Sequence, residues 1–371
     1  MPRSRSIARA KAEPAVSRAD VSRADVSNHP PPLKNDGATS DPAPQRYRFT
    51  PPTLDPATPA RAASTILLAS LGDAVRATVE QIVRGDEPEA VHDLRLALRR
   101  TRCLLGPLRG VFTRTEAARL RTGLRWLGEL SGPPRDLELL VERLEATREE
   151  LPEPDREAIA VLLSMVCRDR DQARRALLKG LASARYGRLG DAWARLASSF
   201  LRPSRENGST RLPRQRPAAP AADQPIATVA AEAIVRAWRR LLRHGKKLSD
   251  SSAAEDFHEV RIDGKKLRYL LELFRSVYPA VDLAPTIENL KSLQNCLGDF
   301  NDAQVQEELL REMAPRLATA DGATAESLLL VGRLIERSHR ARRSARRRFE
   351  DRFSTLAAKD NRRRIRSLAG H

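Results

Sequence analysis

The sequence predicts an all-α protein made of two related helical halves, and three observations lead to this fold class. Leu, Ala, Arg and Glu recur at helical spacing through residues 62–201 and again through residues 226–358. We find no alternation of β-branched residues that would indicate a strand, and aromatic residues make up only 4% of the chain. The second stretch repeats the first at a constant offset of 166 residues, which indicates a duplicated domain.

In the first half, the spacing of apolar residues predicts helices at residues 62–84, 88–111, 114–131, 135–149, 153–185 and 188–200. Gly132, Pro133 and Pro134 should interrupt the chain before the helix that Asp136 begins, because proline does not continue a helix from the preceding turn.

In the second half, the same pattern predicts helices at residues 226–248, 254–277, 282–297, 301–316 and 323–357. Asp302 follows Gly298 as Asp136 follows Gly132, so a break and a new helix start are expected in both halves. A carboxylate at such a start would cap the helix N-terminus. The alternative is that each aspartate orients an arginine or binds a cation.

Three segments have a different composition from the helical halves. Residues 1–61 are predicted to be a disordered basic tail rich in Pro, Ala and Ser, residues 202–225 a disordered linker, and residues 359–371 a basic C-terminal tail. They carry +4, +3 and +4 of the formal net charge of +18, so net charge alone does not locate a site.

The cysteines and the apolar runs bear on the compartment. Cys103, Cys167 and Cys296 are far apart and form no CxxC pair, which argues against a zinc site and for a reducing environment. No apolar run approaches 18 residues, so we expect no transmembrane helix. These features predict a cytoplasmic protein.

The duplicated segment carries a basic stripe in both copies. In AVHDLRLALRRTRCLLGPL, beginning at Ala90, a histidine and three arginines share one arc of a helix, opposite a leucine-rich face. FHEVRIDGKKLRYLLELF, beginning at Phe257, repeats this spacing. The paired positions are His92 with His258, Arg95 with Arg261, Arg99 with Lys265, Arg100 with Lys266, Arg102 with Arg268, and Arg125 with Lys291. The recurrence favours a functional basic face, and a merely solvated helix surface is the alternative.

Two later helices carry further arginines on one face. In the last long helix these are Arg333, Arg337, Arg340, Arg343 and Arg347, and in the first half Arg168, Arg175 and Lys179. Like charges at this spacing destabilise a bare helix, so an anion lying over them would explain the pattern. A solvated helix, with Glu336 and Glu350 relieving the repulsion, is the alternative.

The residue types indicate phosphate as the anion. Arginine binds phosphate oxygens with two parallel hydrogen bonds, and lysine and histidine add charge and donors. Scarce aromatic residues and the lack of Asn and Gln on the basic helices favour a phosphate polymer over sequence-specific nucleic acid. Non-specific nucleic-acid binding or condensation remains the alternative, and we find no motif for an enzyme, a metal site or a cofactor.

The two segments above, each followed by SGPPRD or LGDFND, resemble the CHAD domain, the conserved histidine α-helical domain. The resemblance covers about residues 62–357. It implies two tandem four-helix bundles, residues 62–201 and 226–358, related by a pseudo-twofold and enclosing a basic groove. It further implies binding of inorganic polyphosphate and a place on polyphosphate granules. Ligand contact would then fall to the paired positions named above and to the arginines from Arg333 onward.

Overall fold

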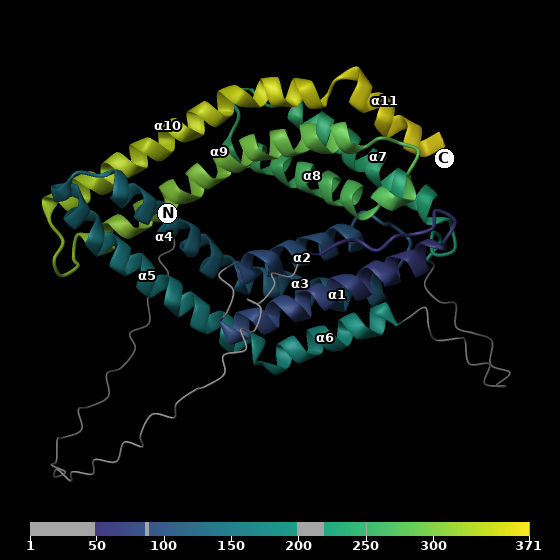
Figure 1. Cartoon of the computed structure of the whole chain (residues 1–371), viewed down its shortest axis with the longest axis horizontal. Helices are drawn as coiled ribbons and strands as arrows, with labels where there is room; N and C mark the ends of the chain where they lie inside the picture. The colour runs from purple at the N-terminus through teal and green to yellow at the C-terminus, as the bar shows by residue number, and fades with distance from the viewer. Residues whose placement is uncertain (1–48, 86–88, 199–218, 250, 371) are drawn as a thin grey trace, which may run out of the picture. The chain divides into compact units, whose positions relative to one another are not determined.

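A computed structural model describes residues 49–85, 89–198, 219–249 and 251–370. Across these ranges the secondary structure is helical, without a strand and with one isolated bridge between Pro59 and Pro225, so the all-α prediction is confirmed. The described residues all belong to one unit. Figure 1 shows its helices in two groups that meet at both ends.

The first group consists of four helices whose leucine-rich faces pack together. They are α1 (Ala60–Arg84), α2 (Ala90–Leu105), α3 (Arg114–Leu130) and α6 (Ala184–Ala197). Trp193 on α6 fixes the contact with α1, because its indole Nε1 donates to the carbonyl of Leu68 at 2.7 Å. Gly72 on α1 leaves the space that the ring fills, since a Cβ there would lie 2.8 Å from the indole nitrogen.

The second group consists of helices from the C-terminal half. They are α7 (Ile226–Gly245), α8 (Ala254–Leu273), the first part of α9 (Ala284–Leu317) and the second part of α10 (Ala325–Leu356), with α11 (Lys359–Ser367) beside them. Phe257 on α8 stacks on Phe300 of α9 with ring centroids 4.6 Å apart and meets Phe349 of α10 edge-on. These aromatic contacts hold α8 against the two long helices.

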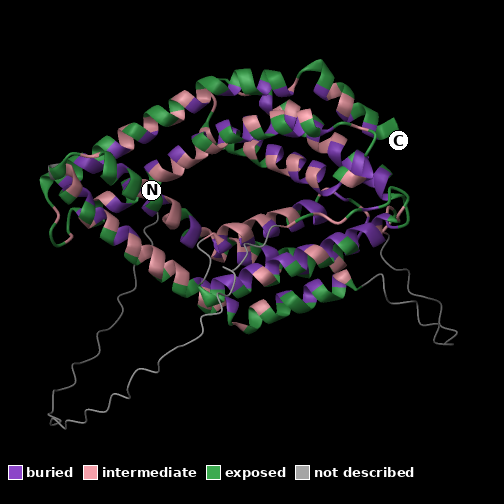
Figure 2. Cartoon of the chain, viewed as in Figure 1, coloured by how far each residue is buried: buried purple, intermediate pink, exposed green. Residues whose placement is uncertain are grey.

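The two groups share one hydrophobic core. It runs without interruption from the leucines of α1 and α2 to the apolar faces of α7, α8 and α9. Backbone hydrogen bonds join the starts of α1 and α7, with the Ala60 amide donating to the carbonyl of Gln224 at 2.8 Å. Figure 2 shows the buried residues on the helix sides that face one another and exposed residues along the outer sides of α6, α10 and α11.

A second, smaller core joins the halves at the opposite end. It is formed by α4 (Gly132–Glu150), α5 (Glu153–Leu181), the last part of α9 and the first part of α10. Leu144, Ile159 and Leu310 are among its fully buried side chains. Helices α4 and α5, which we assigned to the first bundle from the sequence, therefore bury their apolar faces against helices of the second half (Figure 1).

The predicted helix break at Gly298 is wrong. Helix α9 continues from Ala284 to Leu317, because one glycine costs only about 1 kcal/mol in a helix and the neighbouring Leu297 and Phe300 are held in the core. Asp302 therefore lies in a helix interior. Asp136 is the fifth residue of α4, which starts after the single residue Ser131, so neither aspartate caps a helix.

The first half thus uses two helices, α3 and α4, where the second half uses the one helix α9. Because of this difference, the order of the helices does not confirm the internal duplication, which stays a prediction. The other helix ends lie within about four residues of the predicted positions, except where the helix predicted at residues 88–111 ends at Leu105 and that predicted at 254–277 continues as a 3-10 turn, η1 (Arg275–Val277).

The segments predicted as tails and linker are partly ordered. Leu54 is buried and its amide donates to Ser276 Oγ at 3.1 Å, so residues 49–61 pack on the helices. Residues 359–370 form α11 and the 3-10 turn η2 (Leu368–Gly370), because Ile365 and Leu368 reach the main core. The rest of the predicted disorder, residues 1–48 and 202–218, lies outside the described residues.

Helix α1 is long and apolar enough to cross a membrane by length and composition. Within its most apolar window, 67% of the residues are buried inside the protein, as in a core helix. The helix carries Leu67, Leu68 and Leu71 at the centre of the main core.

A candidate anion-binding groove between α2 and α8

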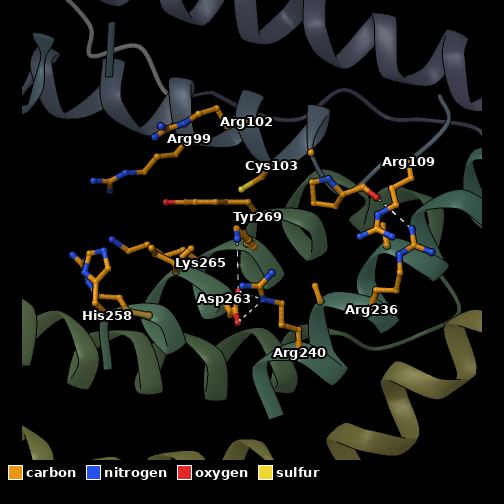
Figure 3. Close-up of a pocket in the computed structure, with 17 residues that line it drawn as sticks. Arg99, Arg102, Cys103, Arg109, Arg236, Arg240, His258, Asp263, Lys265 and Tyr269 are labelled. Atoms are coloured by element: carbon orange, nitrogen blue, oxygen red, sulfur yellow. Dashed lines mark hydrogen bonds and ion pairs between the residues drawn. The ribbon is translucent and has the colours of Figure 1, made fainter. Parts of the chain in front are cut away.

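A pocket of about 600 Å³ opens between α2 on one side and α7 and α8 on the other. Figure 3 shows Arg99 and Arg102 reaching into it from α2, and His258 and Lys265 from α8. The basic stripes of the two related segments therefore face each other across this space. We call the facing side chains the basic groove, which consists of Arg95, Arg99, Arg102, His258, Arg261 and Lys265.

The α2 side of the groove follows directly from the helical pattern. Leu94 and Leu98 are buried in the main core, which turns the opposite face of α2 outward. A smaller pocket of about 200 Å³ is lined by Arg95, Arg99, Arg102 and Arg125 of α3. Because the two pockets share Arg99 and Arg102, the basic surface continues from one into the other.

Two glycines make room for the arginines of α2. The Arg95 guanidinium donates to the carbonyl of Gly128 at 3.2 Å, and a Cβ on Gly132 would lie 3.2 Å from its Nη1. A Cβ on Gly128 would lie 3.6 Å from the Arg102 guanidinium. The junction of α3 and α4 is thus the floor on which Arg95 and Arg102 lie.

The α8 side is held by α9. His258 Nδ1 lies 3.1 Å from the side-chain oxygen of Asn301, and Arg261 Nη2 lies 4.0 Å from a carboxylate oxygen of Asp302. Lys265 is placed between Arg261 and the arginines of α2 and forms no ion pair with any described residue. The long, unbroken α9 therefore positions the first two side chains of this wall.

The groove has more positive charge than its own carboxylates balance. Burial and then the neighbouring Arg261 and Arg99 lower the pKa of Lys265 to about 7. Burial also lowers the pKa values of Arg95, Arg102 and Arg261. Cations held close together in a partly dry site favour a bound anion. The anion offsets the repulsion between the cations and takes the place of the water that they lost on burial.

Two aspartates from different halves accompany these cations. Loss of hydration raises the pKa of Asp136, and the attraction of Arg95 and Arg99 opposes this. Arg143 of α4 donates to the Asp302 carboxylate at 3.2 Å and to its backbone carbonyl at 3.3 Å. Arg143 thereby neutralises Asp302 from the opposite half of the chain. Of the two sequence-based readings, the role of orienting an arginine fits both positions better than capping.

Some predicted site residues point elsewhere. Arg100 and Arg268 share the carboxylate of Glu272, at 3.6 and 3.4 Å, and Arg100 also lies over the ring of Phe49. Lys266 lines the pocket and faces the buried Asp263 at 3.7 Å. Lys291 pairs with Glu288 on its own helix, and the half-buried His92 lines neither pocket.

The arginines of α10 are not brought to the basic groove. Arg333 forms a two-pronged ion pair with Asp155 of α5, and Arg337 pairs with Glu150 of α4. Arg340 and Arg343 share Glu336 of their own helix, while Arg347, Arg168 and Arg175 are exposed and bonded to no described carboxylate. Arg333, Arg337 and Arg340 line a separate hollow on the first part of α10.

The sequence argument missed several pocket residues. These are Cys103, Arg109, Arg236, Arg240, Ile262, Asp263 and Tyr269. Arg236 and Arg240 stand four residues apart on α7, so the same helical-face test would have found them. Asp263 is an acid within the basic run RIDGKK, and its buried carboxylate holds Arg240 Nε at 3.0 Å and His244 Nδ1 at 2.8 Å. Across the ranges that the structure describes, no three His, Cys, Asp or Glu side chains are grouped to hold a metal ion.

The family model of the CHAD domain matches residues 66–311, about two thirds of the chain. The chain belongs to the CHAD domain family. A curated relative, uncharacterized protein Rv2226 of Mycobacterium tuberculosis, is 30% identical over 282 residues, which are 72% of this chain and 50% of that protein. The chain thus spans about half the length of the curated relatives it matches.

Solved structures show the same CHAD fold. The crystal structure of the CHAD domain from the plant Ricinus communis aligns with a TM-score of 0.65 and 22% identity, covering 85% of this chain and 97% of that one. PptA from Streptomyces chartreusis aligns with a TM-score of 0.57 and 20% identity, covering 80% and 100%. At these identities the likeness concerns the arrangement of the helices.

Proposed function

We propose that this CHAD domain binds inorganic polyphosphate in the basic groove, without catalysing a reaction on it. The observation that carries this proposal is the crowding of partly buried cations between α2 and α8, where burial and then Arg261 and Arg99 lower the pKa of Lys265 to about 7. Phosphate groups placed there would supply the missing negative charge and accept hydrogen bonds from several guanidinium groups. The family is associated with polyphosphate, which supports this ligand.

The arrangement suits a chain of phosphates better than one phosphate. Arg95, Arg99 and Arg102 extend over about 10 Å of α2, and Arg261 and Lys265 line the facing helix. Each phosphate along a thread would meet a cation on one wall or the other. Because this charge pattern repeats along the groove, we expect affinity to increase with polymer length until the groove is filled. A cytoplasmic location on polyphosphate granules belongs to the same proposal.

The test is a titration of the full chain with long-chain polyphosphate, comparing two double variants of equal charge change. Arg99→Glu with Lys265→Glu reverses one cation on each wall and should reduce the affinity at least about 100-fold, because two charge-assisted contacts become repulsive. Arg168→Glu with Arg175→Glu changes two exposed arginines of α5 away from the groove and should change the affinity by less than about threefold. Circular dichroism confirms that both variants are folded. Equal losses in the two variants would contradict the groove as the site.

Non-specific nucleic-acid binding gives a different result in competition. Duplex DNA that displaces polyphosphate at equal phosphate concentration would favour it, whereas we expect polyphosphate to remain bound. A flexible thread can follow two facing helices closely, and a stiff duplex cannot enter a pocket of about 600 Å³.

A further inference from the structure

One part of the pocket has walls that polyphosphate would not use. Beyond Arg102, the α2 side continues through Cys103, Gly106 and Pro107, and the facing side is Ala233, Ala237 and Ile262. We call this part the apolar compartment, with Tyr269 at its inner end. Ile262 is 37% exposed and is one of the few large apolar side chains among the described residues to remain so open to water.

Two of the arginines beside the apolar compartment are already engaged. Arg236 donates to the carbonyl of Pro107 at 3.3 Å and pairs with Glu232 at 3.0 Å. Arg240 is held by the buried Asp263 and by Glu259, each at 3.0 Å. A phosphate chain entering this compartment would give up hydration without gaining a comparable set of free cations. The compartment therefore suits an uncharged group attached to an anion.

The polar groups at its two ends define that group further. Figure 3 shows the Tyr269 ring between the α2 arginines and Lys265, while Arg109 and Arg236 stand at the far end. A guanidinium can stack on an aromatic face or donate to ring acceptors. An alkyl chain would offer Arg109, which lines the same pocket, neither contact. A flat ring bearing nitrogen and oxygen acceptors matches the apolar walls and the donors beyond them.

We propose that the apolar compartment receives the base of a nucleoside triphosphate whose phosphates lie against Arg99, Arg102 and Lys265. A pocket of about 600 Å³ has the size typical of small-molecule sites. The inference depends on the basic groove accepting phosphates, as in the proposed function. It adds a second ligand class, recognised by a base that polyphosphate lacks.

The test compares ATP and GTP with inorganic tripolyphosphate by calorimetric titration of the full chain. Tripolyphosphate has the same number of phosphates and a higher charge, so tighter nucleotide binding must come from the nucleoside. We expect the preferred nucleotide to bind at least about tenfold more tightly, because its base buries apolar surface against Ala237 and Ile262, which tripolyphosphate does not. Equal or weaker nucleotide binding would overturn the inference and leave polyphosphate binding intact.

Two variants locate the base. Ile262→Ala removes an apolar wall and Ala237→Phe fills the compartment, and each should bring nucleotide affinity down to that of tripolyphosphate. Leu329→Ala on α10, where the leucine is 68% exposed, is the matched control and should keep the full preference. A preference that persists in both compartment variants would overturn this site.

Long-chain polyphosphate separates the two proposals. The compartment variants should bind it with unchanged affinity, because they leave the six side chains of the basic groove in place. Nucleotide binding without any binding of polyphosphate would refute the proposed function while supporting the compartment. If neither ligand binds, both proposals are refuted.

Discussion

Lys265 shows at the scale of one side chain how the groove is prepared for an anion. Burial, and then the neighbouring Arg261 and Arg99, lower its pKa to about 7 from an ordinary value of 10.5. Above pH 7 the free protein therefore carries Lys265 largely neutral. A nearby phosphate favours the charged form, so binding should raise this pKa and take up a proton.

This predicts a pH-dependent affinity for polyphosphate. Below pH 7 Lys265 is charged in both the free and the bound protein, so its contribution is complete. As the pH rises above 7 and toward the raised pKa of the bound state, affinity should fall by up to about tenfold per pH unit. Titrations between pH 6 and 9 measure this, and Lys265→Met should flatten the decline. If affinity fell as steeply with pH in Lys265→Met as in the parent chain, the pH dependence would belong to another titrating group.

Gly132 and Gly298 occupy matched positions 166 residues apart and should respond oppositely to alanine. A Cβ on Gly132 would press on the Arg95 guanidinium, so Gly132→Ala should weaken polyphosphate binding several-fold. A Cβ on Gly298 would meet nothing within 4 Å beyond its chain neighbours and its own helix backbone, so Gly298→Ala should stabilise α9 by roughly 0.5–1 kcal/mol. Denaturant unfolding and titration of both variants with polyphosphate measure the two effects. If Gly298→Ala stabilised the protein but also weakened binding, the claim that this position affects stability alone would be wrong.

At the scale of elements, α11 shows how a polar segment becomes part of the core. Its sequence is dominated by arginine, yet Ile365 and Leu368 are each about 1% exposed. Asn361 is also buried and accepts a hydrogen bond from Thr286 at 2.9 Å, which ties α11 to the start of α9. Two apolar residues at the right spacing are enough to order a segment that composition alone classes as a tail.

Ile365→Ala should therefore lower the free energy of unfolding by about 2–4 kcal/mol, as for other buried large-to-small changes. Helix α11 does not line the basic groove, so the folded variant should bind polyphosphate as the parent chain does. Thermal unfolding and titration at a temperature where the variant is folded measure both effects. An unchanged unfolding free energy would show that α11 is not docked in solution.

The sequence predicted the helices and their faces better than it predicted which helices pack against one another. Arg99 of α2 and Lys265 of α8 line the same pocket, as the helical spacing led us to expect, whereas His92 and Arg268, predicted on the same two faces, line neither pocket. The same spacing on α10 left two of its arginines, Arg333 and Arg337, paired with acidic residues of α5 and α4. Periodicity tells which side chains point the same way, but the packing of another helix decides what they meet. The sequence did not predict the role of Asp263, because its burial and its ion pair depend on the packing of α7, which carries Arg240.

At the scale of the whole molecule, the groove depends on both halves. Arg95, Arg99 and Arg102 come from α2 and Arg261 and Lys265 from α8, so an anion between them would bridge two regions distant in sequence. Such a ligand binds the folded chain only, and should stabilise it against unfolding in proportion to the logarithm of its concentration. A single cooperative transition that shifts with polyphosphate is therefore expected in calorimetry.

Salt dependence reports the number of cations engaged by the polymer. The logarithm of the binding constant should fall linearly with the logarithm of salt concentration, because bound phosphates release their counterions. Arg99→Gln should reduce that slope by about one, and Arg175→Gln on the exposed face of α5 should leave it unchanged. Titrations at four or more salt concentrations measure both slopes. Similar slopes in all three proteins would indicate that Arg99 contacts no phosphate.

The two hydrophobic cores fasten the halves together at opposite ends of the unit. A hinge motion that opened the groove would have to separate one of these two cores, which would expose leucines such as Leu144 or Leu67 to water. A polyanion would therefore meet two walls whose spacing is already set by the cores, and little of its binding free energy would be spent on rearranging helices.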